Sequence, residues 1–246
     1  MAELIELSRR LGDPALRMAI LGEGNASARV DGSSFLVKAS GSTLEHLGED
    51  DVVECRFAEL LALIDLDEVS DAQVQEALMA SRVDPEAKKP SVESLFHAWL
   101  LTLPDVAFVA HTHATAVTGI LCSPRGREFA EKRIYPDEVV CCDVASVFVP
   151  YTDPGTRLAR AIRQHTRTFL RTHGHVPRVI LLENHGIVTL GRSVDATLAA
   201  MLMAEKAANV WVAASTLGGP VFMTPEHVAR IATRADEAHR RRILES

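Results

Sequence analysis

Three histidines at the ends of two strand-like segments constrain the fold of this chain more than any other feature. The run 106–113 reads as a buried strand that ends on His111 and His113. Residues two apart on a strand project to the same side, so both imidazoles can face one ion at about 2.0–2.1 Å. His185 lies far downstream, again where an apolar strand runs out. A single divalent ion bound by all three, with Glu93 as an oxygen ligand, would require the two strand ends to meet.

The length and charge of the chain limit its class. Its 246 residues, 47% of them hydrophobic, are enough for a sizeable core, and no stretch reads as an interdomain linker, so we expect a single domain over residues 1–246. The net charge of −7, with no basic block except Arg240–Arg242, argues against nucleic acid or an anionic membrane as a partner. No apolar stretch reaches the roughly 18–20 residues of a membrane span, and the N-terminus has no signal-like apolar core. We therefore expect a cytoplasmic protein.

The four cysteines match neither a disulfide framework nor a zinc knuckle in their spacing. They are Cys55, Cys122, Cys141 and Cys142. The last two fall in the apolar run 139–149, which reads as a strand. We interpret all four as reduced, buried thiols of a cytosolic protein.

Apolar periodicity and turn signals predict helices and strands that mix without strict alternation. The predicted helices cover 3–21 with a break at Asp13–Pro14, 58–83 with a break near 65–67, 91–101 with Ser91 as N-cap, 155–172, 195–217 and a last helix from Pro225. The predicted strands cover 28–30 and 35–38 as a hairpin, 52–57, 106–113, 139–149, 178–182 and 187–190, and residues 22–27 read as a turn. We expect an α/β (α+β) fold in which helices flank a mainly antiparallel central sheet.

Short motifs along the chain occur in the order in which one known family has them. They are Gly24–Ser27, Ala39–Ser42, Pro90–Glu93, Ala110–His113, Pro150–Tyr151 with Gly155–Thr156, and Asn184–Gly186. Each is weak alone, but together they span residues 22–191. The chain resembles the class II aldolase/adducin family, which includes L-fuculose-phosphate and rhamnulose-phosphate aldolases. The resemblance implies the three-layer head fold of that family and a homotetramer with sites between subunits.

The resemblance also assigns a metal site. His111, His113 and His185 match the metal ligands of the family, which usually hold zinc, and Mn²⁺ or Co²⁺ would suit the same ligands. Glu93 matches the glutamate that completes the metal shell and acts as the catalytic acid/base. A carboxylate in the first turn of a helix also interacts favourably with the helix dipole, and that is the structural alternative for Glu93.

A set of small polar residues matches the phosphate-binding positions of the family. These residues are Asn25, Ser40, Gly41 and Ser91. Hydroxyls, a side-chain amide and backbone N–H groups can bind an anion without lysine, but the same residue types also dominate turns. The chain departs from the family at Val92, where a second serine is often found, and this leaves open whether the substrate is phosphorylated. Lys38 can either replace the lost donor or point to solvent.

Tyr135 and His97 have two interpretations each. Tyr135 falls about where some family aldolases place a tyrosine that reaches a neighbouring subunit's site and protonates the leaving oxygen, and the alternative is an ordinary surface tyrosine. His97, one helical turn after Glu93, is interpreted as packing, with a hydrogen bond to Glu93 or to the sheet as the alternative. A second His-x-His pair, His173 and His175, reads as a solvated loop.

The resemblance therefore predicts a metal-dependent aldehyde-lyase. A zinc-dependent class II aldolase would cleave a ketose, in particular a ketose 1-phosphate, by retro-aldol chemistry through a metal-stabilised enediolate. Related epimerases, dehydratases and decarboxylases of sugar phosphates or sugar acids are the alternatives. A non-catalytic adducin-like interaction module is disfavoured because all three histidines are present. The sequence does not identify the sugar or its stereochemistry.

Overall fold

The computed structural model describes residues 1–237, so His239 and Arg240–Arg242 lie outside the described part. The strands are β1 (Asn25–Arg29), β2 (Ser34–Lys38), β3 (Val52–Arg56), β4 (Phe108–Thr112), β5 (Val147–Val149), β6 (Val179–Leu182) and β7 (Gly186–Gly191). The helices are α1 (Ala2–Leu11), α2 (Phe57–Asp65), α3 (Asp71–Ser81), α4 (Ser94–Leu101), α5 (Thr115–Leu121), α6 (Gly126–Glu131), α7 (Pro136–Cys142), α8 (Thr156–His173), α9 (Val194–Ser215) and α10 (Pro225–Thr233), with short 3-10 turns at Pro14–Leu16 and Glu49–Asp51.

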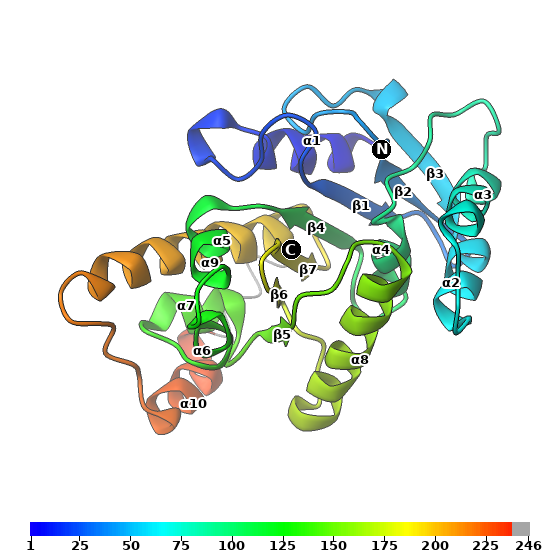
Figure 1. The fold of residues 1–246 in the computed structure, drawn as a ribbon. Helices are drawn as coiled ribbons and strands as arrows, with labels where there is room; N and C mark the ends of the chain where they lie inside the picture. Colours follow the sequence, from blue (N-terminus) through cyan, green and yellow to red (C-terminus); the bar gives the residue numbers. More distant parts are fainter. Residues whose placement is uncertain (238–246) are drawn as a thin grey trace.

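The strands form one seven-stranded sheet in the order β3-β2-β1-β4-β7-β6-β5 (Figure 1). All neighbouring strands are antiparallel except β5 and β6, which are parallel. The prediction of a mainly antiparallel sheet is confirmed. The predicted hairpin is also present, because the Asp31 carboxylate accepts hydrogen bonds from the N–H groups of Ser33 and Ser34 and so stabilises the turn between β1 and β2.

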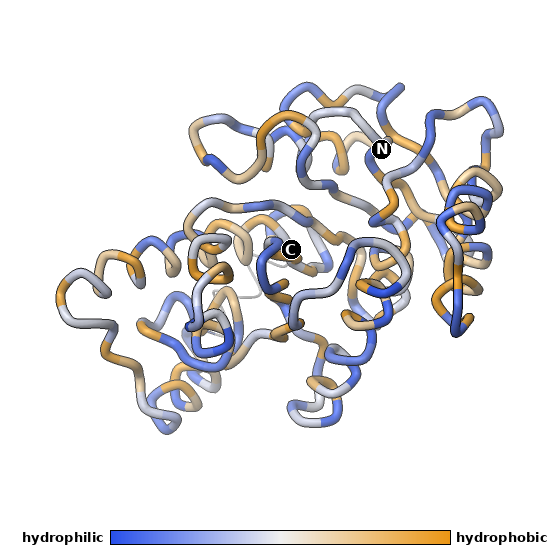
Figure 2. The backbone as a smooth tube through the Cα atoms, viewed as in Figure 1, coloured by the Kyte–Doolittle hydropathy of each residue, from blue (hydrophilic) through white to orange (hydrophobic). Residues whose placement is uncertain are grey.

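Helices cover both faces of the sheet and give three layers. One core packs α1, α5, α6, α7 and α9 against the sheet, and the other packs α2, α3, α4 and α8 against its opposite face. Alternation along the strands supplies both cores, since Ala26 and Ala28 of β1 face the first core while Val109 of β4 faces the second. Figure 2 shows apolar residues along the central strands and a mixed hydrophilic and hydrophobic course along α8, as expected for a helix with one buried side.

The predicted strand over 139–149 is wrong in its first half. Residues 136–142 form α7, and only Val147–Val149 form a strand. Pro136 at the first helical position and two acidic residues in the first turn favour the helix start. The helix ends where Asp143 adopts φ 73°, and the Arg133 guanidinium donates to the carbonyls of Cys142 and Asp143 there. Val140, Cys141 and Cys142 therefore pack as helix residues in the first core.

The start of α4 and the limits of the predicted turn at 22–27 also differ from expectation. Hydrogen bonding places the N-cap of α4 at Glu93, not at Ser91, and β1 already begins at Asn25. The Ser91 hydroxyl instead accepts a hydrogen bond from the Glu93 N–H at 3.3 Å. The Glu93 side chain makes no capping bond, so its carboxylate is available to the site described below.

The cysteine prediction holds for three of the four thiols. Cys55, Cys141 and Cys142 are buried and free, whereas Cys122 is free but exposed. Burial raises the pKa of the Cys55 thiol to about 11, which keeps it protonated and unreactive. Among the described residues, the structure contains no helix that is both long and apolar enough to cross a membrane.

Candidate metal centre and active site

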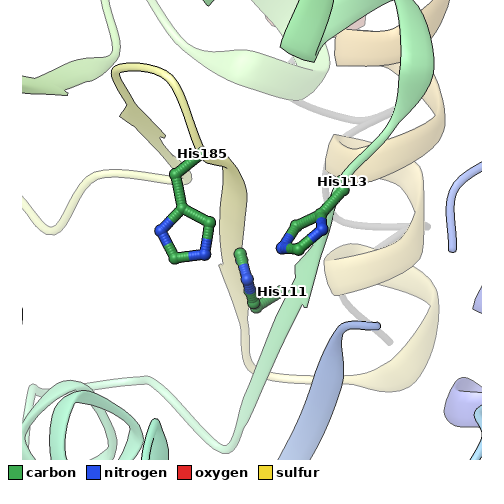
Figure 3. Close-up of side chains that lie close together, drawn as sticks. All are labelled: His111, His113 and His185. Atoms are coloured by element: carbon green, nitrogen blue, oxygen red, sulfur yellow. The ribbon is translucent and has the colours of Figure 1, made fainter. Parts of the chain in front are cut away.

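The three histidines predicted from the strand ends meet at one point (Figure 3). Their ring centroids lie 4.9–5.1 Å apart, and one ring nitrogen from each lies within 4.8 Å of the other two. His111 belongs to the buried strand β4, His113 lies one residue beyond its end, and His185 lies in the turn between β6 and β7. Segments more than 70 residues apart in the chain thus supply one cluster.

Two unusual backbone positions create the turn that carries His185. Asn184 adopts the left-handed conformation at φ 53°, which asparagine tolerates better than most residues. Gly186 then begins β7 so close to β4 that a Cβ atom there would lie 2.4 Å from the Thr112 carbonyl oxygen and 3.0 Å from the His113 ring. Only glycine allows this approach. The turn that brings His185 beside β4 therefore needs glycine at position 186 and is favoured by asparagine at position 184.

The hydrogen bonds of the rings leave one nitrogen of each strand histidine for a metal. His111 Nδ1 donates to the Ile187 carbonyl at 3.0 Å, while its Nε2 is buried without a hydrogen-bond partner. His113 Nδ1 lies 3.5 Å from the Glu23 carboxylate. Burial lowers the pKa of His111 to about 4, so the ring is neutral and its free Nε2 carries a lone pair. Three imidazoles with an orphaned buried nitrogen fit a divalent cation such as zinc.

The Glu93 carboxylate faces this cluster. Its Oε1 lies 3.3 Å from His185 Nε2 and 3.6 Å from His111 Nε2, and its Oε2 accepts a hydrogen bond from Asn25 Nδ2 at 2.5 Å. Burial alone would raise the pKa of Glu93, but His111, His185 and the Asn25 amide outweigh it and hold the pKa below its usual range. An ionised carboxylate between two imidazoles can act as a fourth ligand or as a base.

Three of the four predicted phosphate-binding residues lie on loops, and the fourth, Asn25, is the first residue of β1. The Ser40 N–H donates to the Lys89 carbonyl, directly before Pro90 and Ser91. Asn25 Nδ2 lies 3.5 Å from the Ser91 hydroxyl, and Gly41 adopts φ 81°. The structure thus brings Asn25, Ser40 and Ser91 to one region beside Glu93.

Lys38 does not point to solvent. Its side chain is buried, and Nζ donates to the Ser42 carbonyl at 2.7 Å and to the Gly22 carbonyl at 3.3 Å. Burial lowers the pKa of its ammonium group. Lys38 therefore joins the two loops that precede β1 and follow β2.

Two residues of the site were not assigned a role in it from the sequence. Glu23 contacts His113 and also accepts a hydrogen bond from the Ile20 N–H at 3.0 Å. His97 is fully buried and hydrogen-bonds Asn25 and Ser27 of β1, which confirms the alternative of a bond to the sheet over plain packing. No motif marks Glu23, whereas the spacing of His97 one turn after Glu93 did indicate a hydrogen bond as the alternative to packing.

Tyr135 is not brought to the cluster of its own chain. It lies at the N-cap of α7, and its hydroxyl contacts Met203 Sδ of α9 at 2.9 Å. Burial, reinforced by Glu138, raises the pKa of its phenol, so it stays protonated. The second His-x-His pair, His173 and His175, also lies apart from the cluster. His173 ends α8 and stacks on Phe169, so it is not in a loop. His175 is exposed and lies 3.2 Å from the Asp143 carboxylate.

A cavity of about 620 Å³ adjoins the cluster on the side of His113. Its lining mixes polar and apolar groups and includes Glu23, Thr43, His46, Thr115 and Leu21. A space of this size admits a small polar molecule, and the polar groups can orient it.

Comparison with known proteins agrees with the fold. The family described as Class II Aldolase and Adducin N-terminal domain matches residues 2–212. A solved structure of L-fuculose 1-phosphate aldolase superposes with a TM-score of 0.69 at 20% identity, and the alignment covers 94% of this chain and 93% of that one.

Two curated proteins are similar in sequence. One is the uncharacterized oxidoreductase YuxG of Bacillus subtilis, 29% identical over 70% of this chain, and the chain spans only 24% of its length. The other is methylthioribulose-1-phosphate dehydratase of Pseudomonas aeruginosa, 27% identical over 68% of this chain and 72% of the relative.

Proposed function

Since this chain belongs to the family of the Class II Aldolase and Adducin N-terminal domain, we propose that it is a zinc-dependent aldolase that cleaves a ketose, in particular a ketose 1-phosphate. The observation that carries the proposal is the convergence of three histidine rings on one point, with an ionised Glu93 carboxylate against two of them. Mn²⁺ or Co²⁺ would suit the same ligands.

Each residue has a defined task in the proposed reaction. His111, His113 and His185 hold the divalent cation, which when bound supplies Lewis-acid stabilisation of the negative charge that develops as the C–C bond breaks. Glu93 completes the shell in the resting enzyme and, once substrate enters, moves the proton at the nucleophilic carbon. Tyr135 of a neighbouring subunit acts at the aldehyde oxygen: it takes up the hydroxyl proton as the C–C bond breaks and donates it back in the condensation direction, for which its raised pKa keeps the phenol protonated.

The loops beside Glu93 form the proposed anion pocket. Asn25, Ser40, Gly41 and Ser91 offer short donors there, and the contacts between Ser40 and residue 89 and between Asn25 and Ser91 support a shared binding region. Val92 packs against the second core and offers no donor, so the phosphate would be held by fewer hydroxyls than the family pattern has.

We also propose a cytoplasmic homotetramer with active sites between subunits. Exposed large apolar side chains in the last turns of α9 and in the segment after it support an interface, because apolar groups left exposed on one element can be covered by a second copy. They are Val210, Val212, Leu217 and Val221. The free thiols agree with a reducing compartment.

A dehydratase is the second candidate, favoured by the similarity to methylthioribulose-1-phosphate dehydratase. Epimerases and decarboxylases of sugar phosphates or sugar acids use related chemistry. A non-catalytic interaction module remains disfavoured, because the cluster and its neighbouring carboxylate are intact.

The proposal is tested by metal analysis and a substrate screen. We expect the purified protein to bind one divalent ion per chain and to release dihydroxyacetone phosphate and an aldehyde from a ketose 1-phosphate with zinc, manganese or cobalt. Release of water from the substrate without C–C cleavage would favour the dehydratase. A protein with no affinity for these ions would contradict both enzymes.

The variant His113→Ala gives the matched test of the site. His113 is part-exposed beyond the end of β4, so we expect the far-UV circular dichroism of the variant to be unchanged while metal stoichiometry and activity are lost. Full metal stoichiometry in this variant would contradict the assigned ligand set. His227→Gln, which changes an exposed histidine of α10, serves as the control and should retain both.

A further inference from the structure

His97 connects two residues of β1 to the carboxylate of Glu93. The ring is fully buried on α4, with Nδ1 2.6 Å from the Ser27 hydroxyl and Nε2 against Asn25 Oδ1. Asn25 and Ser27 are two apart on the strand, so both side chains face α4. The other end of the Asn25 amide donates to Glu93 Oε2 at 2.5 Å. Four polar side chains therefore form one continuous hydrogen-bond chain.

The donor and acceptor roles in this chain can be assigned in one way only. An ionised carboxylate only accepts, so the Asn25 group that faces Glu93 must be its NH₂. The Asn25 oxygen then faces His97, which must donate from Nε2–H. A neutral imidazole with hydrogen on Nε2 accepts at Nδ1, so the Ser27 hydroxyl donates there. Burial lowers the pKa of His97 to about 3, which agrees with a neutral ring.

From this chain we infer that His97 is a positioning residue: through Asn25 it holds the Glu93 carboxylate in the orientation that the histidine cluster and the substrate require. The inference rests on the proposed function for the part that Glu93 plays in turnover. A ring that donates from Nε2 prevents the Asn25 amide from rotating by 180°, which would place its oxygen against the carboxylate. The order of the hydrogen bonds, and not the mere packing of His97, keeps a donor on Glu93 Oε2.

The Asn25 amide also links Glu93, the proposed base, to the proposed anion pocket. Asn25 Nδ2 has a second hydrogen, and the Ser91 hydroxyl lies 3.5 Å away on that side. Because His97 fixes the amide plane, it fixes both of these N–H directions together. His97 would thus set the relative position of base and substrate without touching either.

Substitutions at residue 97 separate positioning from packing. In His97→Phe the ring volume stays but the donor is lost, and we expect kcat to fall by about 10- to 100-fold, with KM changing far less. His97→Gln can place an amide N–H near the former Nε2 and should restore part of kcat, whereas His97→Asn is too short to reach Asn25 and should not. Equal activity of the Phe, Gln and Asn variants would overturn the inference. His227→Gln is the control.

A second measurement does not depend on activity or on the folding of any variant. In the metal-free wild-type protein, ¹⁵N chemical shifts of the His97 ring should report the Nε2–H tautomer. The Nδ1–H tautomer or a protonated ring at pH 7 would overturn the inference. A third measurement uses a variant: the Co²⁺ affinity of His97→Phe should fall by about tenfold, because Glu93 is released from its orientation, and wild-type affinity in this variant would count against the inference.

These results distinguish the inference from the proposed function. If the predicted tautomer is found but no ketose is cleaved, the hydrogen-bond chain stands and the reaction assignment fails. If a ketose is cleaved but the tautomer is Nδ1–H, the reaction assignment stands and the role of His97 fails.

Discussion

At the residue scale, the candidate site depends on which atoms of each side chain already contact a neighbouring polar group and which remain for a metal. His113 shows this clearly, because Glu23 lies against its Nδ1 and leaves Nε2 toward the cluster. Carboxylates that accept from the second nitrogen of a ligating histidine fix its tautomer and orient its ring. Glu23 is placed to do this, since its other oxygen is held by the Ile20 N–H.

Glu23→Gln should therefore weaken metal binding without removing a ligand. We expect the affinity for zinc, measured by competition with a chromophoric chelator, to fall by about tenfold, because an amide orients the imidazole less strongly than a carboxylate. Glu45→Gln changes a carboxylate that lines the same cavity but pairs with His46, so it is the matched control and should bind zinc as tightly as the wild type. Equal affinities in the two variants would show that Glu23 has no role.

The sequence predicted the residues of the cluster better than their partners. Strand periodicity was enough to place His111 and His113, because ligands two apart on a strand need no tertiary information. Glu23 and the contact between Asn25 and Glu93 depend on how a loop and a strand meet α4, and no local pattern encodes that. The assignment of Tyr135 stays a prediction, since its proposed task lies in another subunit.

At the element scale, the close approach of β4 and β7 holds the two halves of the site together. The strands pair from Thr112 and Ile187 to Phe108 and Gly191, and the cluster lies at the Thr112 end. Gly186, the first residue of β7, sits where any side chain would meet the backbone of β4.

Gly186→Ala should damage both stability and metal binding. The added Cβ would lie 2.4 Å from the Thr112 carbonyl oxygen, so the strand start must shift. We expect the free energy of unfolding, from urea titration, to fall by about 1–3 kcal/mol, with weaker zinc binding. Gly119→Ala in α5, where a Cβ meets nothing within 4 Å, is the control and should be neutral or slightly stabilising. If Gly186→Ala bound zinc as tightly as the wild type, the close approach of β4 and β7 would not be needed for the metal site.

Element boundaries were the weaker part of the sequence analysis. The run 139–149 alternates little and is rich in β-branched residues, which favour strands, yet Pro136 and the acidic residues after it start a helix. The tertiary cap from Arg133 on the carbonyls of Cys142 and Asp143 could not be seen in the sequence. Ser91 looked like an N-cap because of its type and the proline before it, but its hydroxyl accepts from the N–H of Glu93, which is itself the N-cap two residues later.

At the scale of the whole molecule, the polar side chains buried next to the sheet make stability depend on pH. His97 has its pKa lowered from 6.5 to about 3 by burial, and His111 has its pKa lowered to about 4 by the same cause. The unfolded chain binds these protons more readily than the folded chain does. Their contribution to stability is therefore complete above pH 6.5 and is lost as the pH falls toward the folded pKa values.

The metal-free protein should lose stability steeply between pH 6.5 and 4.5. Each such histidine contributes a slope of about 1.4 kcal/mol per pH unit well below its unfolded pKa, so His97→Gln should flatten the dependence by about that amount. Urea unfolding at several pH values, followed by circular dichroism, measures both slopes. A variant whose slope matches that of the wild type would show that His97 is protonated in the folded protein.

The architecture as a whole was the most predictable level. The mixture of helices and strands without strict alternation predicted the mainly antiparallel sheet, because each strand and helix needs its own apolar face whatever its neighbours are. The order of motifs separately gave the resemblance to the family, which the match over residues 2–212 confirms. The position of α4 against β1, which joins His97 to Asn25, follows from packing across two layers and lay beyond any local signal.

The three imidazoles of the cluster differ in how far solvent reaches them. His111 is sealed at 0% side-chain exposure, while His113 and His185 keep 29% and 17%. A small ligand can approach the cluster beside His113, which lines the cavity. A substrate bound in this cavity would cover that approach, so the cation should dissociate more slowly from the substrate-bound protein than from the free protein.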